Sequence, residues 1–155
     1  MIMIAAPGKV LKDTEGSQIE IMTATFAEDY PLDILIAEDN FINQKLIERI
    51  LTKLGYQTDI AGDGIQALSL FNKKKHNVIL MDIRMPQMDG FETTHVIRQM
   101  AIEQPFIIAM TANAMSSDKE ECIKGGMDEY IPKPISITDV ISKLKIAAEY
   151  LHCIK

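Results

Sequence analysis

Five side chains that can bind a cation or a phosphate group follow short apolar stretches of this sequence. Three of the five are carboxylates, one is a hydroxyl and one is an ammonium group. Carboxylates held close together repel one another unless a cation lies between them, and a hard divalent ion such as Mg²⁺ suits oxygen ligands. In chain order the five residues are Glu38, Asp39, Asp82, Thr111 and Lys133.

Together these groups match the needs of phosphoryl transfer. That reaction uses a nucleophilic carboxylate, cations that neutralise the phosphoryl oxygens, and groups that position the donor. Asp82 directly follows the apolar stretch 78–81, so a rigid strand would fix its oxygens for attack. The loop that follows must turn tightly above the site. Pro86 restricts one φ angle there, and Gly90 accepts conformations that other residues avoid.

The elements that must position these groups alternate along the chain from residue 33 onward. Short apolar stretches are separated by segments with helical spacing. Buried strands separated by helices indicate a doubly wound α/β fold, with a parallel sheet covered on both sides. Ligands of such folds lie beyond the carboxyl ends of the strands, so the five side chains should meet at one edge. The expected strands are 34–37, 57–61, 78–82, 105–110 and 129–132.

Helical spacing also predicts which residues face the core. The first helix has apolar residues four apart, which predicts one buried stripe, and Gly55 follows as a cap. Ser117 and Glu120 have the spacing of a capping box at the start of the fourth helix. The residues expected to be buried are Ile42, Leu46, Ile50 and Leu54 in the first helix, Ile65, Leu68 and Phe71 in the second, and Val140, Ile141, Leu144, Ala148 and Leu151 in the last.

The composition suits a globular domain. The chain has 155 residues, of which 47% are hydrophobic and 25% charged, enough for one domain with its own core. A net charge of −6 leaves no basic face, so nucleic acid is not expected as a partner. Two cysteines without close spacing favour a reducing compartment. No stretch resembles a membrane span or a signal peptide, so we expect a cytoplasmic domain without membrane contact.

Residues 1–32 do not follow the alternation of strands and helices. We expect them to form an N-terminal extension or linker, or the remnant of a preceding domain, with the main domain at 33–155. The letters FAEDY at 26–30 repeat those of IAEDN at 36–40, but no apolar strand precedes them, so they are interpreted as linker. The three histidines lack ligand spacing and are expected at exposed helix or loop positions; they are His76, His95 and His152.

Four motifs in combination resemble the response-regulator receiver domain of two-component signalling: AEDN, MDIRMPQMDG, MTANA and YIPKPI. The resemblance covers residues 33 to about 152. It implies a flavodoxin-like fold with strand order 2-1-3-4-5. It also implies that the domain takes a phosphoryl group from a sensor histidine kinase or a histidine phosphotransfer domain, and then relays it or switches conformation. Its only enzymatic activity would be its own phosphorylation and dephosphorylation.

The resemblance implies roles for the acidic residues. Asp82 would accept the phosphoryl group. Mg²⁺ would be held by Glu38, Asp39, Asp82 and the backbone carbonyl of Arg84. Many receivers have aspartate where this chain has Glu38, so the geometry of the metal site is expected to differ in detail.

The other site residues also take roles from the resemblance. Lys133 would pair with the phosphoryl group, and its peptide bond to Pro134 would be cis. Thr111 would donate a hydrogen bond to the phosphoryl group, and Tyr130 would change rotamer with it. Arg84 and Asn113 would tune the lifetime of the phosphoryl group.

Alternatives remain open from the sequence. One is an aspartyl phosphatase or phosphotransferase of the haloacid dehalogenase type, although such enzymes place the nucleophile on the first strand. Another is a degenerate receiver that acts only as a docking module. The stretch NFINQKLIERILTKLGY resembles the first helix of receivers in hybrid sensor kinases, and EGSQIEI at 15–21 resembles the closing strand of a kinase ATP-binding domain. A hybrid kinase is therefore the favoured parent, with a stand-alone receiver as the alternative.

Overall fold

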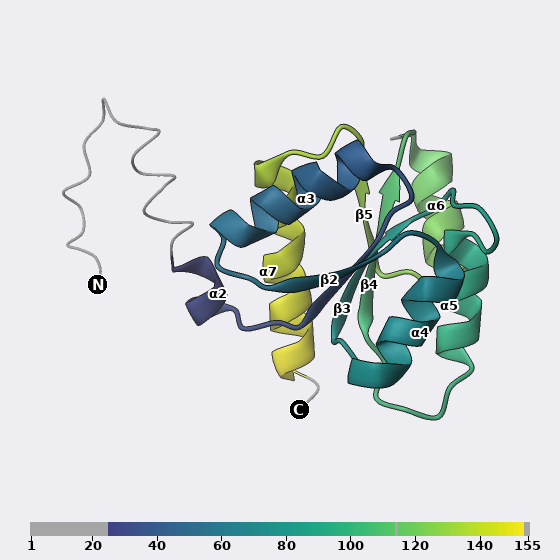
Figure 1. The fold of residues 1–155 in the computed structure, drawn as a ribbon, viewed down its shortest axis with the longest axis horizontal. Helices are drawn as coiled ribbons and strands as arrows, with labels where there is room; N and C mark the ends of the chain where they lie inside the picture. Colours follow the sequence, from purple (N-terminus) through teal and green to yellow (C-terminus); the bar gives the residue numbers. More distant parts are fainter. Residues whose placement is uncertain (1–24, 114, 154–155) are drawn as a thin grey trace.

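The computed structural model describes residues 25–113 and 115–153, and its centre is a five-stranded parallel sheet. The strands lie in the order β2-β1-β3-β4-β5 (Figure 1). This is the doubly wound, flavodoxin-like order expected from the sequence, and it confirms the predicted fold class. The strands are β1 (Ile34–Ala37), β2 (Thr58–Ala61), β3 (Val78–Asp82), β4 (Phe106–Thr111) and β5 (Glu129–Pro132).

Parallel pairing brings the carboxyl ends of all five strands to one edge. Ile34 of β1 lies opposite both Thr58 of β2 and Val78 of β3, and Thr111 at the end of β4 lies opposite Pro132 of β5. The three central strands are buried along their whole length. Helices cover both faces of the sheet, which explains why these strands are apolar without alternation.

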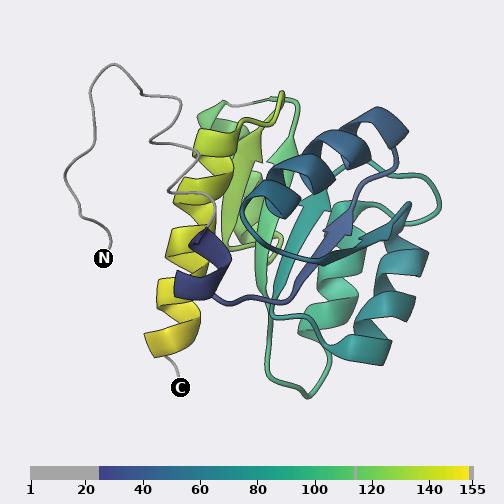
Figure 2. The same ribbon diagram turned by 60° about the vertical axis from the view of Figure 1, so that its left-hand side comes forward.

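Helices cover the two faces of the sheet in separate groups (Figures 1 and 2). Alternate strand residues serve the two layers: Ile34 and Ile36 pack with α3 and α7, whereas Leu35 and Ala37 pack with α4, α5 and α6. The helices are α3 (Phe41–Lys53), α4 (Gly64–Lys74), α5 (Gly90–Arg98), α6 (Ser116–Lys124) and α7 (Ile137–Cys153).

The stripe predicted for α3 is wrong in its first half. Ile42 and Leu46 are exposed to 75% and 37%. Four residues turn the helix by about 400°, so a stripe built only from steps of four drifts around the axis. The buried face combines steps of three and four residues and consists of Ile47, Ile50, Leu51 and Leu54.

Two alanines take core positions in place of the residues that the pattern predicted to be buried. In α4, Ile65 is 54% exposed, whereas Ala67 and Phe71 are buried. In α7, Ala147 is fully buried and Ala148 only partly. Alanine gives a weak periodic signal, because its hydrophobicity is low and it occurs on every face of a helix. The pattern therefore located both helices but misplaced part of their inner faces.

The capping box predicted for α6 does not form. The helix begins at Ser116, so Ser117 already lies inside it, and Met115 at the N-cap makes no side-chain cap. A capping box is found instead at α5, where Asp89 and Glu92 each accept a hydrogen bond from the other's backbone N–H.

Residues 26–29, expected to be linker, form the short helix α2 (Phe26–Asp29). Phe26 is buried in the core layer shared by α3 and α7, and the backbone N–H of Ala27 donates to the carbonyl of Leu54 at 2.9 Å. The Tyr56 hydroxyl donates to the carbonyl of Tyr30 at 2.6 Å. These contacts join residues that lie far apart in the sequence, so no local pattern predicts them. Residues 1–24, including the EGSQIEI stretch, lie outside the described part of the chain.

None of the helices in the described ranges has the length and apolar content that crossing a membrane requires.

Candidate functional site

The carboxyl edge of the sheet brings together the five residues singled out from the sequence. Glu38 and Asp39 directly follow β1, Asp82 ends β3, Thr111 ends β4, and Lys133 directly follows β5. All except the buried Glu38 line one open cleft of ≈ 680 Å³. The fold itself gathers them, because parallel strands end at the same edge.

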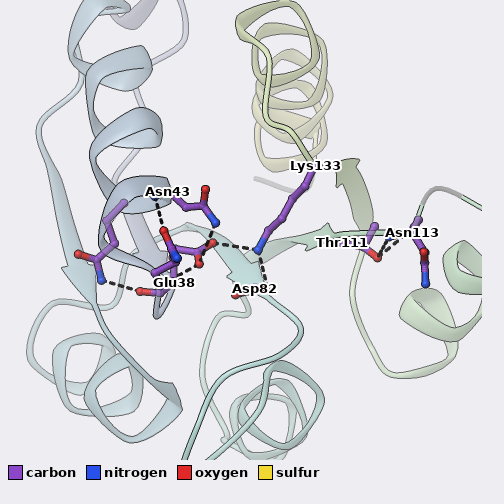
Figure 3. A network of polar contacts seen from close by, with 8 residues as sticks. Glu38, Asn43, Asp82, Thr111, Asn113 and Lys133 are labelled. Atoms are coloured by element: carbon purple, nitrogen blue, oxygen red, sulfur yellow. Dashed lines mark hydrogen bonds and ion pairs between the residues drawn. The ribbon is translucent and has the colours of Figure 1, made fainter.

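Lys133 occupies the centre of this cluster (Figure 3). Its Nζ lies 3.1 Å from Oδ1 of Asp82 and 3.2 Å from Oε1 of Glu38. The peptide bond between Lys133 and Pro134 is cis, as the resemblance implied. One ammonium group therefore faces two carboxylates that are almost fully buried.

The three carboxylates are arranged in a way that fits a divalent cation. Glu38, Asp39 and Asp82 each offer an oxygen, and these oxygens lie within 4.8 Å of one another. Oε1 of Glu38 is buried and receives no hydrogen bond, although it is ion-paired with Lys133. An oxygen with unused lone pairs beside two other carboxylates suits Mg²⁺, which binds oxygen ligands and retains several waters.

Charge in the cleft is unbalanced, and the pKa of Asp82 reports it. The pKa of Asp82 is raised from 3.8 to about 6, because burial and, after it, the negative charge of Glu38 raise it and Lys133 only partly opposes them. For Lys133, burial alone would lower the pKa, but the Asp82 and Glu38 carboxylates outweigh burial and raise it. The lysine is thus held in its charged form, while the carboxylates still lack positive charge.

The loop after β3 closes tightly over this edge. The N–H of Gly90 donates to the carbonyl of Ile83 at 2.8 Å, and a Cβ at Gly90 would collide with the backbone of Asp82 and Ile83. Gly90 is therefore needed for close approach, whereas the sequence suggested a special backbone conformation. The left-handed residue of the loop is Gln87, with φ of 68°. Met85, a residue of the same loop, is buried.

Thr111 does not bond to Asp82 in this structure. Its hydroxyl donates to the carbonyl of Asn113 at 3.0 Å and accepts from the N–H of Asn113 at 3.1 Å, so it points into the loop after β4 (Figure 3). Such a local turn is common for threonine, but the sequence did not reveal it, because many residue types complete the same turn.

Tyr130 lies on β5 between two lysines from different helices. Lys119 of α6 and Lys143 of α7 place their ammonium groups 5.4 and 5.5 Å from the ring centre. Lys143 is also paired with Glu129 at 2.9 Å. Cation–π contacts of this kind hold an aromatic ring in place. Sequence reasoning missed them because they join three separate elements.

The histidines lie away from the cleft, and one prediction about them is wrong. His76 is buried, with Nε2 at 2.7 Å from Oδ2 of Asp59 and its ring stacked on Phe71. His95 and His152 are exposed, as expected. His76 stabilises the core near the start of β3 and is remote from the acidic edge.

A doubly wound sheet with an acidic, lysine-containing cleft at its carboxyl edge defines the class to which this fold belongs. The family model that matches the chain, over residues 34–145, is the response regulator receiver domain. The chain belongs to this family, and it is a receiver domain of two-component phosphorelay signalling. Nothing in the comparisons supports the haloacid dehalogenase alternative, and Asp82 lies on the third strand.

Relatives of known identity agree with this assignment. Hybrid signal transduction histidine kinase B of Dictyostelium discoideum is 36% identical over an alignment of 142 residues, which covers 84% of this chain and 7% of that protein. Sensor histidine kinase RcsC of Escherichia coli K12 is 38% identical over 116 residues, 75% of this chain and 12% of that protein. The chain therefore spans only a small part of these relatives.

Solved structures with the same fold include two informative receivers. The receiver domain of sensor histidine kinase PA1611 from Pseudomonas aeruginosa, described with magnesium in its active-site cleft, is 39% identical with a TM-score of 0.68 over 76% of this chain and 98% of that one. The Saccharomyces cerevisiae receiver of Ssk1, crystallised with the phosphotransfer protein Ypd1, is 25% identical with a TM-score of 0.71 over 76% of this chain and 88% of that one.

Proposed function

We propose that Asp82 is the phosphoryl acceptor of this receiver domain. The observation that carries the proposal is the position of Asp82 at the end of a buried strand, open to the cleft and paired with Lys133 at 3.1 Å. An Asp82 oxygen bonds to phosphorus while the bond between phosphorus and the donor's histidine nitrogen breaks. The rigid strand fixes this oxygen for in-line attack.

Glu38, Asp39, Asp82 and the backbone carbonyl of Arg84 would hold Mg²⁺. The proposal rests on the three adjacent carboxylate oxygens and on the unused lone pairs of Glu38. When bound, Mg²⁺ supplies positive charge against the phosphoryl oxygens and neutralises the crowded carboxylates. Burial and, after it, the charge of Glu38 raise the pKa of Asp82, and a bound cation would oppose both.

Lys133 and Thr111 complete the proposed chemistry. Lys133 faces Asp82 and neutralises a phosphoryl oxygen, and Thr111 turns from Asn113 to donate its hydroxyl to another. Tyr130 then moves into the space that Thr111 leaves and gives up its contacts with the lysines of α6 and α7. The net charge of −6 disfavours binding to phosphate-rich surfaces, so nucleic acid and anionic membranes are not proposed as partners of this domain.

The donor is a sensor histidine kinase or a histidine phosphotransfer domain, and it docks beside the cleft. Phe41 and Ile42 at the start of α3 are exposed to 66% and 75%, and Leu46 follows one turn later at 37%. These three form an apolar patch beside the acidic cleft, where a partner must present its phosphohistidine to Asp82. Exposed apolar side chains at such a place suit a protein partner.

The parent protein is proposed to be a hybrid histidine kinase that works in the cytoplasm. The proposal rests on the named relatives, which are much longer than this chain. Residues 33–155 would form the receiver, with residues 1–32 upstream of it, although α2 packs on the receiver core.

Phosphorylation with a phosphohistidine donor tests the proposal. Wild type is expected to gain one acid-labile phosphate in the presence of Mg²⁺, seen by intact mass, and Asp82→Asn none. A wild type that gains no phosphate would favour the degenerate receiver, whereas an Asp82→Asn protein that gains a normal one would place the acceptor elsewhere. Asp59→Asn is the matched control, because this carboxylate lies on β2 and contacts His76.

A further inference from the structure

Glu38 is held by the end of β2 on one side and by the start of α3 on the other. Its N–H donates to the carbonyl of Ala61 at 3.0 Å, and its own carbonyl accepts from Nε2 of Gln44 at 2.6 Å. Gln44 therefore satisfies a backbone oxygen that leaves the sheet at the end of β1. This contact ties the acidic loop to the helix that follows it.

The side chain of Glu38 is held by its other oxygen. Oε2 accepts from the N–H of Asn40 at 3.1 Å and from Nδ2 of Asn43 at 3.5 Å (Figure 3). Oε1 is left facing Lys133 at 3.2 Å, without a hydrogen bond of its own. The contacts on Oε2 thus fix the orientation of the carboxylate, with its other oxygen toward Lys133.

A glutamate at this position needs such support. It has one more methylene group than aspartate, and therefore one more rotatable bond to be fixed when its oxygen is placed. The start of a helix is a favourable place for a carboxylate, because free N–H groups point at it. Asn43 adds a side-chain donor that holds the longer side chain of Glu38 in its orientation toward Lys133.

We propose that Asn43 and Gln44 are positioning residues that bend Glu38 into the metal site. This inference rests on the proposed Mg²⁺ site. It assigns to α3 the orientation of Glu38, a role separate from binding the metal. Asn43 acts on the side chain of Glu38, and Gln44 acts on its backbone. Neither touches the cation or the phosphoryl group.

A double-mutant cycle on Mg²⁺ affinity tests the proposal. Titrations followed by amide NMR shifts are made on the full chain without any phosphodonor. Asn43→Ala and Gln44→Ala are each expected to weaken Mg²⁺ binding by about tenfold, as for other residues that orient metal ligands. In a Glu38→Asp background, Asn43→Ala should have less than about a twofold effect, because the shorter side chain does not reach the amide.

Controls separate positioning from loss of structure. Thr52→Ala changes an exposed side chain near the other end of α3 and should leave Mg²⁺ affinity unchanged. Equal weakening by Asn43→Ala in both backgrounds would mean a general structural role and overturn the proposal, as would unchanged affinity in both single variants. Should wild type itself show no Mg²⁺ response, the metal site of the proposed function fails first.

Discussion

At the scale of single residues, Asp82 sets how the domain responds to pH. The pKa of Asp82 is raised to about 6 from an ordinary 3.8, so between these values the folded state binds more protons than the unfolded state. Asp82 therefore costs the metal-free domain no stability below about pH 4, and its cost grows as the pH rises to about 6 and above. Asp82→Asn removes this penalty and should stabilise the metal-free protein by about 2 kcal/mol at pH 7.

Urea unfolding followed by circular dichroism measures this effect, since the chain has no tryptophan. The advantage of Asp82→Asn should vanish near pH 4. Added Mg²⁺ should stabilise wild type more than the variant, because it binds the intact set of carboxylates. A variant less stable than wild type at pH 7 without metal would contradict the pKa shift.

Thr111 is expected to couple phosphorylation to the rest of the domain. A charge-assisted hydrogen bond to the phosphoryl group contributes about 1.5–3 kcal/mol. That bond biases a two-state equilibrium roughly 10–150-fold, less what the hydroxyl loses when it leaves Asn113. We expect Thr111→Ala to accept a phosphoryl group on Asp82 but to lose most of the response at Tyr130.

The ring signals of Tyr130, recorded by NMR with and without beryllofluoride, report this response. Thr138→Ala, at an exposed position near the start of α7, is the control. Equal responses of wild type and Thr111→Ala would remove Thr111 as the coupling residue. If wild type does not respond, the domain acts as a phosphoryl relay without a conformational output.

How far single residues could be predicted depends on where their partners lie. Glu38, Asp82 and Lys133 could be placed together from sequence, because each follows a recognisable strand and parallel strands end at one edge. The pairing of His76 with Asp59 could not, since it joins two elements whose side-chain directions no local pattern gives.

At the scale of elements, α2 is expected to be part of the folded domain. Phe26 is 5% exposed and lies 4.8 Å from the ring of Tyr30 and 6.2 Å from that of Tyr56. Truncating a buried phenylalanine typically costs about 3–5 kcal/mol. Phe26→Ala should therefore lower the free energy of unfolding by about 3 kcal/mol, measured by urea unfolding.

Glu28→Ala is the matched control for α2. Its side chain is exposed on the same turn, so the change should stay within about 0.5 kcal/mol. A Phe26→Ala protein as stable as wild type would restore the interpretation of these residues as a linker.

The elements themselves were predicted with uneven success for a physical reason. The three central strands were found because each is a short apolar stretch buried by helices on both faces, which is a property of local sequence. The helix α2 was missed because four residues are too few to show a period. Its stability comes from contacts with Leu54 and Tyr56, which only the folded chain supplies.

At the scale of the whole molecule, docking of the protein phosphodonor can be tested separately from phosphoryl transfer to Asp82. Ile42 belongs to the exposed apolar patch on α3, and its hydrocarbon side chain has no group that could bind the cation or the phosphoryl group. Ile42→Asp should slow phosphoryl transfer from a phosphotransfer protein by about tenfold or more, because buried interface anchors contribute upward of 1–2 kcal/mol. Phosphorylation by acetyl phosphate should be unchanged, since a small donor needs no docking surface.

Ile123→Asp provides the comparison, because Ile123 is 47% exposed on α6, on the opposite face of the sheet. Transfer from the protein donor should be normal in this variant. If Ile42→Asp slows both donors equally, the residue acts on the site; if it slows neither, the partner docks elsewhere.

The packing of α2 also has a consequence for how the domain sits in a longer polypeptide. Residues 29–32 line one groove together with Asn77, Leu151 and His152, so both ends of the described chain lie near the start of β3. That is the amino edge of the sheet, and the acidic cleft is at the other. Within the described residues, the two chain ends therefore lie on the side away from Asp82, and successive partners can approach the acidic cleft from the opposite side.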